Sequence, residues 1–266
     1  MCDTFTLNMA KPKHSRPEPK NTLQGTRILG RIGGRPAIFF KSKKAGGILT
    51  LESAGERTIA QLAELDPRVR SIAAQPFSLD VSTGRLYTSR EALAEARGER
   101  HSLEARHRDY TPDLLLELVN GLKPAVEVKD PRYPGDALYK AKLAKARLIL
   151  KMRGQSLLTI YFRYQETAPL VHNAELLSRI QYADNPIRDL GELAYRIDTV
   201  LGSDETELAK LLPALGIDLR EAGLLVLHGL LSADLRSRTL DADTRVRAAG
   251  GSLDHLQLLP LDEVQG

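Results

Sequence analysis

Two apolar runs separated by Asn120-Gly121 restrict the fold of this 266-residue chain more than any other stretch. An Asn-Gly pair between two such runs is typical of a β-hairpin. The first run, residues 114–119, is apolar at nearly every position, which indicates a strand buried on both faces, and Asp113 precedes it. The second run, residues 125–129, alternates apolar and charged side chains. The stretch therefore predicts two paired strands with charged groups at one end.

The register of this hairpin decides which charged groups meet. A two-residue turn at Asn120-Gly121 would set Asp113 opposite Val128 and on the wrong face, because a shift of one residue moves a side chain to the other side of a sheet. A three-residue loop, residues 120–122, instead sets Asp113 opposite Lys129. We therefore predict this longer loop or an equivalent bulge.

These residue types suit metal-assisted cleavage of a phosphodiester. The carboxylates of Asp113 and Glu127 are hard oxygen ligands for Mg²⁺, for which Mn²⁺ would substitute. Lys129 would position the attacking water or help to deprotonate it, and would offset charge that develops on the phosphate. Asp-X13-Glu-X-Lys is the pattern of the PD-(D/E)xK nucleases, and Pro112 completes it. The alternative is an ordinary hairpin that ends in an exposed glutamate and lysine.

Length and composition set the broad class of protein. A chain of this length with 42% hydrophobic residues can bury a large core and is expected to form two domains. Its single cysteine, Cys2, excludes an internal disulfide and a cysteine-based zinc site. Its apolar runs are shorter than the roughly 20 residues that a membrane helix requires, and no signal-peptide pattern is present. We expect a soluble cytoplasmic protein with no membrane partner.

Charge is distributed unevenly along the chain. Residues 1–172 contain 29 Lys and Arg against 18 Asp and Glu, whereas residues 173–266 contain 9 against 16. A basic segment suits a polyanion such as DNA, and an acidic segment does not. The two parts are therefore expected to bind different partners.

Two basic segments are candidates for contact with a DNA backbone. The strand expected near residues 35–44 follows a basic arm, and the helix expected over residues 136–153 follows the second hairpin strand. For both segments the alternative is a solvated surface. The candidate contact residues are Lys41, Lys43, Lys44, Lys140, Lys142 and Lys145.

A helix is predicted between Glu52 and Pro67, because apolar residues recur there at helical spacing and the proline ends the pattern. Ser53 followed three residues later by Glu56 is a capping-box pattern. Glu56 is therefore either a structural cap or a third carboxylate that enters the site.

The order and approximate spacing of several motifs resemble the TnsA family, the endonuclease subunit of heteromeric cut-and-paste bacterial transposons. The similarity covers about residues 27–185. Its motifs are Glu52-Ser-x-x-Glu56, Leu65-Asp-Pro67, Gln75-Pro-Phe77, Tyr110-Thr-Pro-Asp113, Glu127-Val-Lys129 and His172-Asn173-Ala-Glu-Leu-Leu177.

This resemblance implies a catalytic set of Glu56, Asp113 and Lys129, with Glu127 in the second metal-ligand position and Gln75 in support. It implies a Mg²⁺-dependent endonuclease that hydrolyses one DNA strand at each transposon end. A separate TnsB-like DDE transposase and a TnsC-like AAA+ ATPase would be its partners, in the nucleoid region of a bacterial cytoplasm. The alternatives are a stand-alone nuclease of repair, restriction or phage biology and a non-catalytic DNA-binding adaptor.

The predicted fold class is α/β, with a restriction-endonuclease-like mixed sheet and a C-terminal helical, winged-helix-like domain. Residues 1–26 are expected to form a disordered basic arm, residues 27–168 the nuclease domain, and residues 169–266 the second domain. Residues 83–109 form an insert that departs from the family pattern. The second domain offers few basic groups on its expected last helix, so we interpret it as a module that docks another protein.

Overall fold

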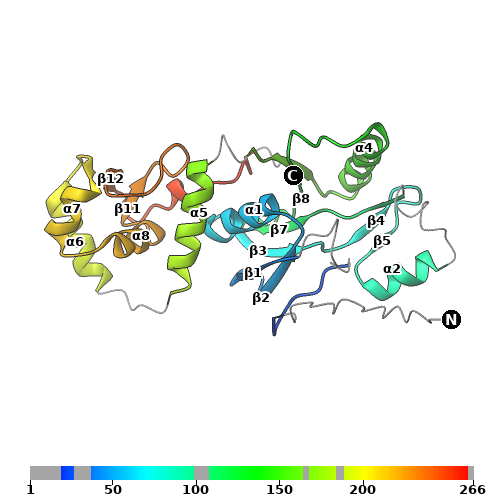
Figure 1. Cartoon of the computed structure of the whole chain (residues 1–266), viewed down its shortest axis with the longest axis horizontal. Helices are drawn as coiled ribbons and strands as arrows, with labels where there is room; N and C mark the ends of the chain where they lie inside the picture. The colour runs from blue at the N-terminus through cyan, green and yellow to red at the C-terminus, as the bar shows by residue number, and fades with distance from the viewer. Residues whose placement is uncertain (1–18, 27–36, 99–107, 164–167, 184–188, 263–266) are drawn as a thin grey trace, which may run out of the picture.

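The computed structural model describes residues 19–26, 37–98, 108–163, 168–183 and 189–262. Within these ranges the chain is a mixed α/β protein with seven α-helices and four small sheets. A four-stranded sheet and helix α1 lie between a C-terminal lobe on one side and helices α2 and α4 on the other (Figure 1). Most of the predicted basic arm and part of the predicted insert lie outside the described residues.

The four-stranded sheet is mixed and has the order β3-β7-β8-β9. Strands β3, β7 and β8 pair antiparallel, whereas β8 and β9 are parallel. Two parallel neighbours require a crossover connection, which helix α4 supplies. The bounds are Val69–Ala74 for β3, Leu114–Leu118 for β7, Ala125–Lys129 for β8, Ala137–Met152 for α4 and Leu157–Tyr161 for β9.

The predicted hairpin is present as β7 and β8, but its register differs from the prediction by two residues. Leu114 pairs with Val126, and the last ladder bond joins Leu118 N–H to the Leu122 carbonyl at 2.8 Å. The loop therefore has the predicted length but consists of residues 119–121. Gly121 ends this loop with a φ of 86°, the left-handed conformation that three-residue hairpin loops place at their last position.

Continuing this register sets Asp113 opposite Glu127 instead of Lys129, which corrects the prediction. Because the shift is an even number of residues, Asp113 keeps the predicted face of the sheet. Strand β7 also differs from the expected fully buried strand, because its alternate positions Leu115 and Glu117 are only half-buried.

Helix α1 packs on this sheet. It follows a hairpin of β1 (Ile38–Ser42) and β2 (Gly47–Leu51), spans Ala54–Leu65 and contacts β3, β7 and β8. Ser53 caps its first turn by accepting the Glu56 N–H, and the helix stops two residues before Pro67. Both helix ends agree with the sequence pattern.

A three-stranded sheet of order β5-β4-β6 and the short helix α2 extend the fold beside α4 (Figure 1). Strands β3 and β4 are separate, because Gln75 takes a φ of 46° between them. Helix α2 lies within the predicted insert. The bounds are Ser78–Asp80 for β4, Leu86–Tyr87 for β5, Arg90–Arg97 for α2 and Asp109–Tyr110 for β6.

The C-terminal lobe contains four helices and a small sheet of order β10-β12-β11. The helices expected in this part are present, and strand β10 lies between α6 and α7. Pro213 lies inside α7, which ends at Gly216 in the left-handed conformation. The bounds are Ala168–Gln181 for α5, Leu190–Leu201 for α6, Thr206–Glu207 for β10, Leu208–Leu215 for α7, Leu219–Leu227 for α8, Leu231–Ala233 for β11, Arg245–Ala248 for β12 and Asp254–Leu256 for the 3₁₀ helix η1.

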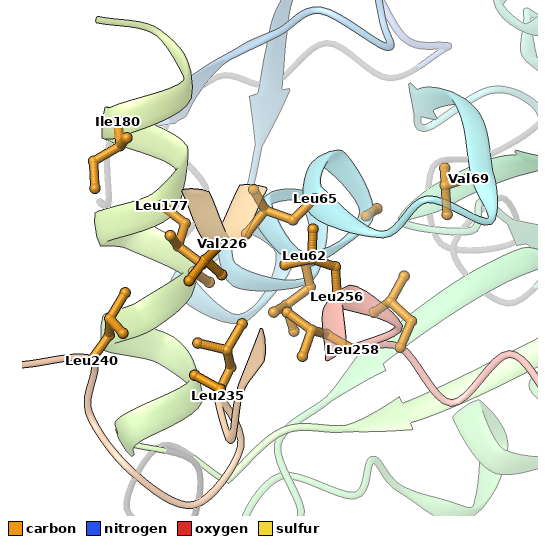
Figure 2. Close-up of a cluster of buried hydrophobic side chains, with 14 of the residues drawn as sticks. Leu62, Leu65, Val69, Leu177, Ile180, Val226, Leu235, Leu240, Leu256 and Leu258 are labelled. Atoms are coloured by element: carbon orange, nitrogen blue, oxygen red, sulfur yellow. The ribbon is translucent and has the colours of Figure 1, made fainter. Parts of the chain in front are cut away.

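The C-terminal lobe and the region around α1 share one hydrophobic core. Helix α5 contacts both α1 and α8. Leu62 and Leu65 of α1 belong to the same buried cluster as Leu177 of α5, Val226 of α8 and Leu256 of η1 (Figure 2). The predicted domain boundary at residues 168 and 169 therefore falls at the start of a helix that both parts pack against. No helix in the described ranges is long and apolar enough to cross a membrane.

Candidate active site

Three carboxylates from different elements share one buried region. Glu56 lies in the first turn of α1, Asp113 precedes β7, and Glu127 lies in β8. Burial, followed by the charges of Glu127 and Glu56, raises the pKa of Asp113 well above its usual range. Burial, with smaller contributions from Glu52 and Glu127, also raises the pKa of Glu56. These mutual effects show that the three acidic side chains lie near one another.

Glu127 is held by three donors. Tyr110 donates to its Oε2 atom at 2.9 Å, and the Tyr139 hydroxyl donates to Oε1. The Lys129 ammonium nitrogen lies 2.8 Å from the same Oε1 atom. Burial raises the pKa of Tyr110 well above its usual value, and the charge of Glu127 adds to this, so Tyr110 stays a neutral donor. The orientation of Glu127 is therefore fixed by side chains on three elements.

Tyr139 links the lysine to the carboxylate. Its ring lies under Lys129, with the ammonium nitrogen 4.1 Å from the ring centroid, while its hydroxyl binds Glu127. The sequence analysis did not identify Tyr139 as part of the site. Its position could have indicated it, because Tyr139 lies at the start of the helix that directly follows the strand carrying Glu127 and Lys129.

Asp113 lies where the β7 and β8 ladder ends. Its Oδ2 atom accepts the Val128 N–H at 2.7 Å, so the side chain takes the place of a main-chain acceptor at the end of the ladder. The Asp113 carbonyl also accepts the Gln75 N–H at 3.0 Å. The aspartate is therefore tied to β8 on one side and to the segment after β3 on the other.

Glu56 caps the start of α1 and also lies close to Asp113. Its Oε1 atom accepts the Ser53 hydroxyl at 2.8 Å and its Oε2 atom accepts the Glu52 N–H at 2.8 Å, which stabilises the start of α1. The same carboxylate lies near enough to Asp113 to raise the pKa of that group. A helix cap thus also fixes the third acidic side chain of the cluster.

Gln75 supports the cluster indirectly. It is buried, adopts a φ of 46° that non-glycine residues rarely take, and donates from Nε2 to Oε1 of Glu52 at 3.0 Å. Its carbonyl accepts the Thr26 N–H at 2.9 Å. Gly25 lies so close that an added Cβ would meet the Gln75 Cβ at 2.9 Å. Gln75 therefore connects the neighbour of Glu56 with the chain near residue 25.

The lysines predicted to bind DNA fall into two groups. Lys41, Lys140 and Lys145 are exposed. Lys44 instead donates to the carbonyls of Ala63 and Asp66 at the end of α1, at 2.9 and 2.6 Å.

Burial lowers the pKa of Lys44 to about 8. Lys43 donates to the Gln181 carbonyl at 3.1 Å, and Lys142 donates to the Asp109 carbonyl at 3.0 Å. The ammonium groups of Lys43, Lys44 and Lys142 thus each donate to a main-chain carbonyl of the fold, although Lys43 itself is exposed. Contact of these three residues with DNA stays a prediction.

The chemistry of the cluster fits a hard divalent cation. In the described part of the chain, no group of three or more His, Cys, Asp or Glu side chains is arranged so that it could hold a metal ion by itself. Mg²⁺, however, is commonly bound through one or two carboxylates, water and substrate phosphate. Asp113 and Glu127 can supply those carboxylates, and Tyr110 donates to Oε2 of Glu127. A cation would also offset the repulsion among the three acids.

No protein-family model matches the chain, and no curated protein matches it. The chain is therefore defined by its own fold and site, as a mixed α/β protein with a buried cluster of three carboxylates beside a lysine.

Proposed function

We propose that this chain is a metal-dependent DNA endonuclease with a PD-(D/E)xK core. The observation that carries the proposal is the meeting of Glu56, Asp113, Glu127 and Lys129 where α1 begins and the β7 and β8 ladder ends. Acids and a lysine that are distant in sequence rarely share a buried region without a functional reason, because each ionised group is costly to bury.

The surrounding fold supports this class. A mixed sheet with α1 packed on it presents the acidic pair at the edge where two antiparallel strands separate. The order α6-β10-α7-α8-β11-β12, with the three strands in one small sheet, supports the winged-helix-like interpretation of the C-terminal lobe. Both features agree with the architecture that the sequence motifs predict.

Each residue has a distinct part in the proposed reaction. Asp113 and Glu127 would hold Mg²⁺ or Mn²⁺, which supplies Lewis-acid stabilisation of the phosphate and lowers the pKa of a bound water. Lys129 lies beside Glu127, where its ammonium group can orient the attacking water and offset charge that develops on the phosphate. Tyr110 and Tyr139 keep Glu127 oriented, and Glu56 completes the acidic cluster.

The biological setting follows from the motif resemblance and stays part of the proposal. A TnsA-like subunit would cut one strand at each transposon end, beside a TnsB-like DDE transposase under the control of a TnsC-like AAA+ ATPase. A stand-alone nuclease of the same fold is the second candidate. Genes for a transposase and an AAA+ ATPase next to the gene for this chain would favour the first.

Cleavage of supercoiled plasmid by the full-length chain, alone and with the neighbouring transposase, tests the proposal. Mg²⁺ or Mn²⁺ should support nicking, and Asp113→Asn or Lys129→Met should reduce its rate by at least ~10³-fold, about 4 kcal/mol of lost transition-state stabilisation. Glu117→Gln is the matched control, because this acid lies on the same strand and contacts Ser71 instead of the cluster. Equal nicking by wild type and Asp113→Asn would overturn the proposal.

A further inference from the structure

The C-terminal lobe contains a groove of about 860 Å³ on the outer side of its small sheet. Arg245 and Arg247 of β12 line it, together with Arg238 from the loop after β11. Ser232 and His255 lie on the same groove. Neither the proposed nuclease chemistry nor the sequence motifs assign a role to this surface.

The local fold explains why the arginines face outward together. Side chains alternate along a strand, so Val246 enters the core while Arg245 and Arg247 are exposed on the other face. Two residues along a strand span about 6.6 Å, which sets the spacing of the two Cα atoms.

The loop that carries Arg238 is fixed by the buried side chain of Asn173. The Asn173 amide donates to the carbonyls of Leu235 and Arg238 at 3.0 and 2.7 Å and accepts the Leu240 N–H at 2.7 Å. The third arginine is therefore held in place by the core of the lobe instead of projecting from a loose loop.

These arginines form no close ion pair, unlike several arginines elsewhere in the chain. Arg68, Arg97, Arg132 and Arg179 each form an ion pair with a carboxylate at 2.6 to 2.8 Å. Within the described ranges, Arg238, Arg245 and Arg247 form no ion pair or side-chain hydrogen bond. Their nearest acidic neighbours are Glu207, which lies opposite Arg245 across the sheet, and Asp234, whose pKa the charge of Arg238 helps to lower.

Acidic residues also line the groove, but two of them are engaged by hydrogen bonds within the lobe. Asp234 accepts bonds from the Arg236 and Ser237 N–H groups and from the Ser237 hydroxyl, and Asp254 accepts the Gln257 amide at 2.8 Å. Glu205 is the third acid. The groove therefore presents three guanidinium groups beside three carboxylates, two of which already accept hydrogen bonds from the lobe itself.

We propose that this groove binds the phosphate backbone of a nucleic acid. A guanidinium group is planar, and its N–H groups match the oxygens of a phosphate. Two such groups at alternate positions of one strand suit a ligand that carries negative charges at regular intervals, as a nucleic-acid backbone does. The inference goes beyond the proposed nuclease and does not depend on cleavage, because it concerns binding in the other lobe.

The test measures binding of the full-length chain to a fluorescent 30-base-pair duplex in EDTA over a series of KCl concentrations. Arg245→Gln/Arg247→Gln should weaken binding and reduce the slope of log affinity against log salt by about 1.8, because each phosphate contact contributes roughly 0.9. Arg179→Gln/Arg196→Gln is the control, since it removes two positive charges from helices of the same lobe, where Arg179 pairs with Glu175 and Arg196 donates to the Ala214 carbonyl. The control should leave the slope unchanged.

Circular dichroism and thermal melting establish that each variant is folded. A folded Arg245→Gln/Arg247→Gln variant with wild-type affinity and slope would overturn the inference. So would a variant that keeps DNA binding but loses binding to poly-glutamate, which would assign the groove to an acidic protein partner. Loss of cleavage in Asp113→Asn with DNA binding retained tests the nuclease proposal separately.

Discussion

Tyr139 and Lys129 form a contact in which the ammonium nitrogen lies 4.1 Å from the centre of the ring. The tyrosine comes from α4 and the lysine from β8, so this contact joins the crossover helix to the strand that carries the reactive groups. The exposed Lys140 and Lys145 lie on the same helix. Binding of a polyanion to α4 can therefore affect the position of Lys129 through Tyr139.

Substitutions of Tyr139 separate its two contacts. Tyr139→Phe keeps the ring under Lys129 and removes the hydrogen bond to Glu127, which should weaken Mg²⁺ binding by about tenfold, the equivalent of one lost hydrogen bond to a charged group. Tyr139→Leu removes both contacts and should also lower the rate at saturating metal. Calorimetric titration and cleavage rates against metal concentration measure the two effects. Tyr161→Phe, an exposed tyrosine on β9, should behave as wild type.

Metal should stabilise the folded chain. A ligand that binds only the native state adds about 2.7 kcal/mol to the free energy of unfolding at one hundred times its dissociation constant. Urea denaturation with Mg²⁺ and with EDTA should show this difference in the wild type and in Glu117→Gln. Asp113→Asn should abolish it, and an unchanged metal effect in that variant would place the cation elsewhere.

The raised pKa of Asp113 predicts how stability depends on pH without metal. Because its folded pKa lies above its unfolded value of about 3.9, the folded state binds more protons between the two values. The stability that this group contributes is present in acid and is lost as pH rises through the folded pKa. In EDTA, the free energy of unfolding of the wild type should therefore fall relative to that of Asp113→Asn between pH 4 and pH 8. Parallel curves for the two proteins would contradict this assignment.

Lysines with different surroundings should respond differently to substitution. Lys140→Gln/Lys145→Gln should weaken DNA binding and lower its salt dependence, because both side chains are exposed. Lys44→Met should leave DNA binding unchanged but reduce stability by about 1 to 3 kcal/mol, since it leaves the carbonyls of Ala63 and Asp66 without their donor. Anisotropy titrations and urea denaturation of both variants measure these effects. A DNA-binding defect in Lys44→Met would restore the original interpretation of that residue.

Local sequence patterns predicted much of the architecture. The hairpin of β7 and β8, helix α1 with its Ser53 cap, and the helices of the C-terminal lobe follow from periodicity, capping residues and turn signals. The register was predicted two residues away from its observed value, because it depends on which loop residue adopts the left-handed conformation. Gly121 does so as the last residue of the loop.

Contacts between distant segments could not be predicted in the same way. No sequence spacing relates Tyr139 to Glu127 or Lys44 to the end of α1, since those contacts exist only after the elements pack. The total charge of residues 173–266 likewise concealed the arginines of β12, because a sum of charges says nothing about which side chains share a face.

The core shared through α5 also limits which parts of this protein can be exchanged. Leu177 packs in one cluster with Leu62 of α1 and Val226 of α8, so removing either lobe would expose apolar side chains of the other. Suppose that recombination or an engineered fusion exchanged the C-terminal lobe alone. The new lobe would then need side chains whose shapes match those of the α1 region at this shared core. The binding properties of this lobe are therefore inherited together with the α1 scaffold that holds Glu56, and new specificities are expected to arise by substitution on the surface instead of by exchange of whole modules.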